Sequence, residues 1–189
     1  MYKRQYQNNT CQLGDHLILT KPLGVSIITV GYSAEEISEE AFVKATTSME
    51  TLNKYAMDII RKYPINSCTD VTGFGLAGHL HEMMNERFSA KIHSKDLPYF
   101  EEAYQGAKEF ILTAGGQRNR NYMEQKMDFQ LDDFGIEELL FDPQTSGGLL
   151  VSVPADQADT LVQELQAADI PAQDFGVVIE KQEKELIVY

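Results

Sequence analysis

The sequence predicts an α/β (α+β) fold, in which a mixed β-sheet carries helices packed on one face. Three observations lead to this class. Runs rich in β-branched residues alternate with runs of helical period along the 189-residue chain. Apolar residues make up 43% of the chain, as in ordinary globular proteins, and no apolar run approaches membrane-spanning length. No repeat, low-complexity tract or proline-rich linker divides the chain, so we expect one domain.

The first elements are predicted from local composition. Residues 16–20 (HLILT) and 25–30 (VSIITV) are rich in β-branched side chains and flank a Lys-Pro-Leu-Gly turn, which predicts two strands. A long helix is predicted over 33–61, where Ser33 and Glu36 resemble a capping box. Its apolar side chains recur at helical spacing and predict one buried stripe, made of Phe42, Ala45, Met49, Leu52, Ala56 and Ile59.

The later elements alternate in the same way. Glycine, proline and polar clusters mark the boundaries between them. In chain order we expect a strand at 65–71, a helix at 75–86, a strand at 90–94, a helix at 99–111, a loop at 113–126, a short helix at 135–141, a strand at 149–153, a helix at 155–168 and a closing pair of strands at 174–180 and 185–189.

Charge and cysteine content narrow the class of protein. The net charge of −13 argues against a nucleic-acid surface and against adhesion to an anionic membrane. The start, MYKRQYQNNT, lacks the apolar segment of a secretory signal. Only two cysteines occur, Cys11 and Cys68, so no disulfide framework is expected. A reducing cytoplasm is therefore the expected location.

The stretch CTDVTGFGLAGHLHEMM begins at Cys68 and contains the most informative pattern. A short strand gives way to Gly73, Gly75 and Gly78, and a helix follows. Glycine allows close approach of a ligand, and a helix N-terminus attracts anions. The spacing matches neither a dinucleotide fingerprint nor a Walker loop. From the residues alone, phosphate binding and a tight structural turn both remain open.

Asp70 stands at the entrance of this loop. A bare carboxylate repels phosphate, but a Mg²⁺ ion between the two would make it a ligand, because Mg²⁺ prefers carboxylate oxygens plus substrate phosphates. The alternative is that Asp70 caps the following turn or helix, which is an ordinary role for aspartate. Spacing does not separate the two.

Other polar residues allow two interpretations each. The string DPQTSGG at 142–148 is either a second ligand-facing turn or a structural turn. Arg118 and Arg120 in GGQRNRN can contact phosphate or belong to a solvated loop. His79 and His81 lie two apart on a predicted helix, so they face different ways and are expected to be packing or surface residues. Cys68 is expected to be a buried structural thiol.

Four strings, LGDHLILTKPLG, CTDVTGFGLAGHLHEM, GGQRNRN and DPQTSGGLLVSV, occur in the order found in selenophosphate synthetase (selenide, water dikinase). From Leu13 onward the chain resembles the C-terminal domain of that family, within the wider aminoimidazole ribonucleotide synthetase superfamily. The resemblance implies the fold of that C-terminal domain. It also implies that residues 13–189 form the domain and residues 1–12 an N-terminal tail or a remnant of an interdomain linker.

The family makes selenophosphate from ATP, selenide and water, with release of AMP and phosphate, for selenocysteine and selenouridine synthesis. Its N-terminal half supplies a catalytic Cys or selenocysteine with a nearby Lys, and most of the metal-binding aspartates. The C-terminal half contributes one more aspartate. The match to TDVTGFG implies that Asp70 is a Mg²⁺ ligand at an interdomain ATP site.

Further site residues follow from the resemblance, by position in the two long motifs. They are Thr69, Thr72, Gly73 and Gly75 in the first loop and Thr145, Ser146, Gly147 and Gly148 in the second. Cys11 does not match the catalytic Cys motif, so no catalytic residue is assigned to this chain. ATP and selenide are expected to bind through the N-terminal half, and a homodimer is a possible assembly.

A rival hypothesis treats the chain as a non-catalytic module that dimerises or binds another protein through the face that the N-terminal half would cover. Such a face should be unusually apolar. Nucleotide binding would favour the enzyme-like interpretation, and oligomerisation without nucleotide binding would favour the module. A different superfamily kinase is disfavoured by the strings TDVTGFG and DPQTSGG.

Overall fold

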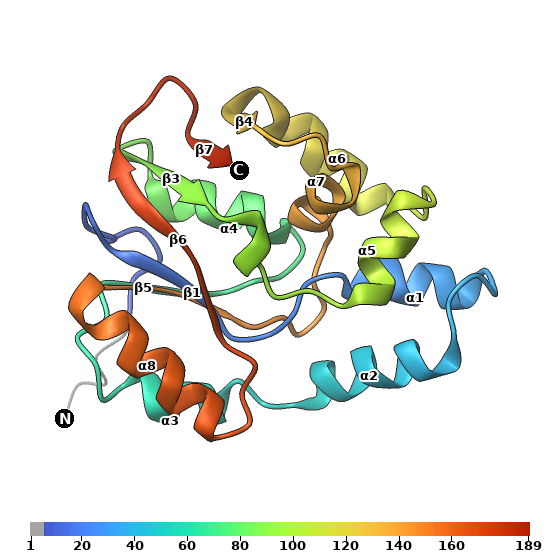
Figure 1. Ribbon diagram of the computed structural model, residues 1–189, viewed down its shortest axis with the longest axis horizontal. Helices are drawn as coiled ribbons and strands as arrows, with labels where there is room; N and C mark the ends of the chain where they lie inside the picture. The colour runs from blue at the N-terminus through green and yellow to red at the C-terminus, as the bar shows by residue number, and fades with distance from the viewer. Residues whose placement is uncertain (1–5) are drawn as a thin grey trace.

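The computed structural model describes residues 6–189, and their strands form one seven-stranded mixed sheet (Figure 1). Its order is β2-β5-β1-β6-β3-β7-β4, in which the first five strands pair antiparallel and β3–β7–β4 pair parallel. The strands are β1 (His16–Leu19), β2 (Ser67–Asp70), β3 (Phe88–Ile92), β4 (Met127–Phe129), β5 (Leu149–Val153), β6 (Gln173–Glu180) and β7 (Leu186–Val188). The predicted mixed sheet is confirmed. Residues 1–5 of the predicted tail lie outside the described residues.

Helices cover the sheet in two unequal layers. They are α1 (Val25–Ser33), α2 (Glu39–Glu50), α3 (Lys54–Ile60), α4 (Gly75–Met84), α5 (Glu101–Lys108), α6 (Ala114–Met123), α7 (Phe134–Phe141) and α8 (Ala155–Ala167), with 3₁₀ turns η1 (Ser94–Asp96) and η2 (Glu124–Lys126). Within residues 6–189, no helix is both long and apolar enough to cross a bilayer.

The two layers follow from the alternation of side chains along each strand. Leu17 and Leu19 of β1 enter the larger core with residues of α1, α2 and α4–α7, whereas Ile18 enters a smaller core with Leu161 of α8 and Ile60 of α3. Figure 1 shows α3 and α8 together on their own side of the sheet. Most helices therefore share one face, as predicted, and α3 with α8 adds a second, smaller layer.

The predicted strand at 25–30 is wrong, because these residues begin α1. Gly24 turns the chain with φ 108°, and the first free N–H groups of the helix are capped from a distant loop: Ser26 N donates to the Asp142 carboxylate at 3.0 Å. Strand preference in β-branched residues is a weak force compared with packing and capping. The helix buries Ile27 and Ile28 in the larger core.

The predicted helix over 33–61 is two helices. Ser38, rather than Ser33, caps α2, since its hydroxyl accepts the N–H of Ala41 at 3.3 Å. Thr51 then adopts an extended backbone and ends α2. The break exposes Leu52, which is 59% accessible, so the predicted stripe does not continue through it.

The break changes what a substitution at Leu52 should do. Leu52→Ala is expected to change the unfolding free energy by less than about 0.5 kcal/mol, because an exposed side chain loses little burial. Leu80→Ala in α4, where the leucine is 0% exposed, should cost about 2–5 kcal/mol. Denaturant unfolding of both variants measures the difference, and equal midpoints would show that the assigned burial is wrong.

Two smaller predictions are also corrected. Residues 113–126 are mostly helix α6, not a loop, and Thr113 caps the helix by accepting the N–H of Gly116 at 2.9 Å. The glycines there serve close packing, since a Cβ on Gly115 would lie 2.5 Å from the Pro143 ring.

The last two strands do not pair with each other, because β6 and β7 flank β3 on its two sides. The sequence did not predict β4, and the other helices and strands lie close to their predicted positions.

Candidate functional site

The two glycine-containing motifs lie side by side, although they are far apart along the chain. β2 pairs antiparallel with β5, which places Asp70 opposite Leu149. Beyond the strands, Val71 N donates to Gly148 O at 2.9 Å, and Gln144 N donates to Thr72 O at 3.0 Å. The loops 71–74 and 142–148 therefore form one continuous surface.

Asp70 ends β2 with an exposed side chain. Among residues 6–189, no side chain or backbone group forms a hydrogen bond or ion pair with its carboxylate. Helix α4 begins after Phe74 and has no side-chain cap, so the capping alternative for Asp70 is wrong. The carboxylate borders an open, mainly polar groove of about 610 Å³ lined by residues 6–9 and 68–70.

The first loop owes its shape to the backbone of Thr72. Its N–H donates to His79 Nε2 at 3.0 Å, and its carbonyl accepts the N–H groups of Gly75 at 3.1 Å and Gln144 at 3.0 Å. Gly75 has φ 68°, and a Cβ there would lie 2.8 Å from Phe141 O. Gly73 is open, with no atom within 4 Å of a built Cβ. Thr69 lies beside Asp70 on β2 and is half-buried.

The second loop is held by two side-chain donors, buried Lys21 and half-buried Asn53. Lys21 Nζ donates to Ser146 O at 2.8 Å and also to two carbonyls at the end of α2, while Asn53 Nδ2 donates to Gly147 O at 2.8 Å. Burial lowers the pKa of Lys21. Thr145 and Ser146 are exposed, whereas Gly147 and Gly148 are buried, where a Cβ would meet Val71 O at 2.2 Å or Lys21 N at 2.5 Å, respectively.

Asp142 and Gln144 have a role that the sequence did not reveal. Asp142 Oδ2 accepts Ser26 N–H and the Gln144 side-chain amide, both at 3.0 Å, and Gln144 Oε1 accepts Val25 N–H at 3.4 Å. The two side chains thus cap α1 across the fold. Asp142 is 1% exposed and its Oδ1 has no partner among the described residues. Burial raises the pKa of this carboxyl to about 7, against the opposing effect of its hydrogen-bond donors.

The shift predicts a pH dependence of stability. The ordinary pKa of 3.8 applies in the unfolded chain, so between pH 4 and 7 the folded state keeps a proton that the unfolded state loses. The contribution of Asp142 to the free energy of unfolding therefore falls as pH rises and stays low above pH 7. Asp142→Asn cannot ionise and can still accept the Ser26 N–H.

Denaturant unfolding at pH 4.5, 6 and 8 tests this prediction. The variant should gain stability over the parent as pH rises, by on the order of 2–4 kcal/mol at pH 8, and little at pH 4.5. A difference that stays constant with pH would show that folding does not raise the pKa of Asp142.

Arg120 is not available to phosphate, which corrects one alternative. Its guanidinium contacts Glu138 at 2.7 Å and Glu137 at 2.9 Å, and it lies 4.8 Å from the centre of the Phe141 ring. Arg120 therefore fastens α6 to α7. Arg118 is exposed on α6, a helix rather than the solvated loop of the other alternative.

His79, His81 and Cys68 take structural positions, as predicted. His79 is 6% exposed, and His81 contacts Glu185 at 2.5 Å and Lys126 at 2.9 Å. Both thiols are buried, and burial raises the pKa of Cys11 to about 11 and that of Cys68 to about 12. Thiols with such pKa values are poor nucleophiles. Nor do three His, Cys, Asp or Glu side chains converge on a metal-sized site within residues 6–189.

The sequence profile described as "AIR synthase related protein, C-terminal domain" matches residues 12–189. The chain belongs to this family. Curated relatives include the selenide, water dikinase of Desulfitobacterium hafniense strain Y51, 46% identical over 94% of this chain, and that of Agathobacter rectalis, 45% identical over 97%. These matches confirm the resemblance noted from the motifs. The chain spans about half the length of these relatives, 52% and 54% respectively.

Solved structures confirm the fold of an AIR synthase related C-terminal domain. Thiamine-monophosphate kinase from Stenotrophomonas maltophilia K279a has a TM-score of 0.65 at 15% identity, with 97% of this chain and 52% of that one covered. HypE of E. coli, a hydrogenase maturation protein, has a TM-score of 0.63 at 15% identity, with 97% and 48% covered. At such identity, the likeness establishes the fold alone.

Proposed function

We propose that this AIR synthase related domain is the C-terminal half of an ATP-dependent selenide, water dikinase, which makes selenophosphate with release of AMP and phosphate. The sequence identity to curated selenide, water dikinases over nearly the whole chain supports the reaction class. One structural observation supports a role for this chain in that reaction. Asp70 is an exposed carboxylate without a partner among residues 6–189, beside two loops fixed by hydrogen bonds to the buried side chains of Lys21 and His79. The products would serve selenocysteine and selenouridine synthesis in the cytoplasm.

Asp70 fits a Mg²⁺ ligand by the chemistry of its donor group. A free carboxylate next to a loop with exposed hydroxyls suits a cation that also binds substrate phosphates. The ion would neutralise charge on the transferred phosphoryl group. The chain's own contribution is to hold the carboxylate at the end of β2, to present the hydroxyls of Thr145 and Ser146, and to keep the loop backbone of 72–75 rigid.

The remaining ligands and the nucleotide platform must come from elsewhere, since no ligand cluster is present within residues 6–189. The chain by itself is therefore expected to show no selenide-dependent ATP cleavage. Purified chain incubated with Mg-ATP and selenide should form AMP at the rate of a protein-free control, while a full-length curated relative serves as the positive control. AMP formation above background would contradict the division of labour proposed here.

A second candidate, a non-catalytic dimerisation or protein-interaction module, is favoured by one surface. Leu52 and Tyr55 are 59% and 57% exposed beside an apolar cavity of about 330 Å³ at the α2–α3 corner. Sedimentation of the chain and of Leu52→Asp separates the candidates. A dimer that dissociates in the variant would favour the module.

A further inference from the structure

His79 lies in the first half of α4, directly beneath the loop that follows Asp70. Its side chain is buried, and its Nε2 atom lies 3.0 Å from the backbone nitrogen of Thr72 and 3.3 Å from the Thr72 hydroxyl. The Phe74 ring covers the imidazole edge-on, with the ring centres 6.0 Å apart. A side chain of α4 thus binds the loop that precedes this helix.

The contact with the Thr72 N–H determines the protonation of the ring. A backbone N–H can only donate, so Nε2 must accept and cannot carry a proton. The neutral ring then carries its proton on Nδ1. Both the Nε2–H tautomer and the imidazolium ion would place the Nε2–H of His79 against the N–H of Thr72. The geometry therefore selects one of three protonation states.

The Nδ1 atom is buried and forms no hydrogen bond with the described residues. The nearest carboxylate is Glu82 Oε2, at 3.5 Å, one turn further along α4. A buried donor without a partner is destabilising, so a histidine that served packing alone would be poorly suited to this position. What distinguishes histidine here is the acceptor at Nε2, which reaches the Thr72 N–H while the ring fills the space under Phe74.

We propose that His79 is a positioning residue for the candidate metal site, an inference that rests on the proposed function. Its acceptor fixes the N–H of Thr72, while the N–H groups of Gly75 and Gln144 fix the Thr72 carbonyl. Two residues earlier, Asp70 ends β2, where it pairs with Leu149, and Val71 N donates to Gly148 O. In this proposal the Thr72 anchor completes the set of bonds that hold the backbone on the C-terminal side of Asp70, and His79 acts without touching metal or substrate.

The first test uses the chain itself. A long-range ¹H–¹⁵N spectrum should show His79 as the neutral Nδ1–H tautomer at pH 7.5. An Nε2–H tautomer or a charged ring would overturn the inference. This measurement needs no variant, so it stands even if a substitution prevents folding.

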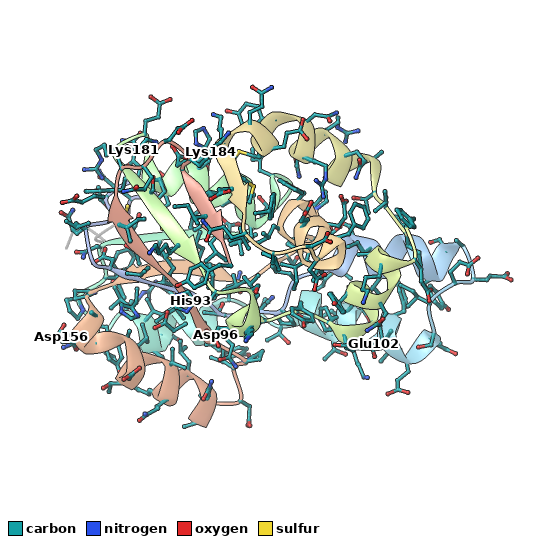
Figure 2. The ribbon with its side chains drawn as sticks, turned by 45° about the horizontal axis from the view of Figure 1, so that its top comes forward. His93, Asp96, Glu102, Asp156, Lys181 and Lys184 are labelled. Carbon is teal, nitrogen blue, oxygen red and sulfur yellow. The ribbon has the colours of Figure 1, made fainter. Side chains whose placement is uncertain are left out.

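The second test asks whether the ring holds the loop. His79→Phe keeps a flat ring but removes the acceptor, whereas His79→Gln keeps an acceptor at a similar reach. Hydrogen exchange of the Thr72 amide should speed up at least tenfold in the Phe variant, relative to amides of β1, and return towards the parent rate in the Gln variant. His93→Phe, at the half-buried residue that precedes η1 and is labelled in Figure 2, is the matched control. Unchanged Thr72 exchange in His79→Phe would overturn the inference.

The third test separates this inference from the proposed function. The chain replaces the C-terminal half of a curated relative, and AMP release is followed against Mg²⁺ concentration. His79→Phe should raise the Mg²⁺ needed for half-maximal rate by about 10–100-fold, and His79→Gln should restore most of it. If Thr72 exchange depends on His79 while Asp70→Asn stays active, the proposed function fails and the loop anchor stands. An unchanged Mg²⁺ requirement in His79→Phe, with Asp70→Asn inactive, overturns the positioning role alone.

Discussion

Gly75→Ala is expected to destabilise the domain by about 2–5 kcal/mol. Gly75 has φ 68°, a conformation that costs an L-residue roughly 1–2 kcal/mol. The added Cβ would also lie 2.8 Å from Phe141 O and 2.9 Å from Leu140 O, which are backbone atoms that cannot move alone. Both effects act at the start of α4, so the loop and the helix should be disturbed together.

Gly73→Ala provides the matched control, two residues away in the same motif. Gly73 is exposed, has no positive φ, and offers a Cβ no neighbour within 4 Å. Its substitution should therefore change stability by less than about 0.5 kcal/mol. Denaturant unfolding of the two variants measures the contrast. Similar losses for both would mean that the motif needs general flexibility rather than one positive-φ position with a tight backbone contact.

The sequence predicts the elements whose signals are local. The boundaries of β5 and α8 follow from an apolar run and from an amphipathic pattern, and both lie where expected. Residues 25–30 form a helix because Asp142 and Gln144, more than 110 residues away, supply its caps. The long helix divides near residue 51, where Lys21 binds two carbonyls at the end of α2. Neither interaction leaves a local trace in the sequence.

The candidate site, too, was predicted where the signal is local and missed where it depends on distant residues. The motif strings identified both loops, and the structure places them in contact through Val71 and Gly148. The motifs did not reveal that Gly147 and Gly148 are buried packing positions, because a double glycine suits a ligand loop and a tight contact equally well. Arg120 looked free for phosphate because its partners, Glu137 and Glu138, belong to another helix.

Asp70→Asn should abolish the reaction of a complete enzyme while leaving this domain folded. The substitution removes the anionic ligand but keeps the size of the side chain. Because the Asp70 carboxylate has no hydrogen-bond or ion-pair partner among residues 6–189, its loss should change the unfolding free energy by less than about 0.5 kcal/mol. Asp70→Ala should behave alike, since Asp70 does not cap α4. Loss of activity without loss of stability would separate a functional carboxylate from a structural one, and the metal role follows from the ligand preference of Mg²⁺.

Asp156→Asn is the matched control, because Asp156 is also exposed and Figure 2 shows it at the start of α8, on the smaller helical layer. A chimera is made from the N-terminal half of the Desulfitobacterium hafniense relative and this chain, which is 46% identical to the part it replaces. Unfolding midpoints confirm that each variant is folded before its activity is compared.

The decisive measurement is selenide-dependent AMP release by this chimera with Asp70, Asp70→Asn and Asp156→Asn. The account predicts an active chimera, an active Asp156→Asn control and a loss of at least a hundredfold for Asp70→Asn, roughly 2.7 kcal/mol of lost transition-state stabilisation. Near-normal AMP release by the folded Asp70→Asn chimera would contradict the assignment of Asp70 as the metal ligand that this chain supplies.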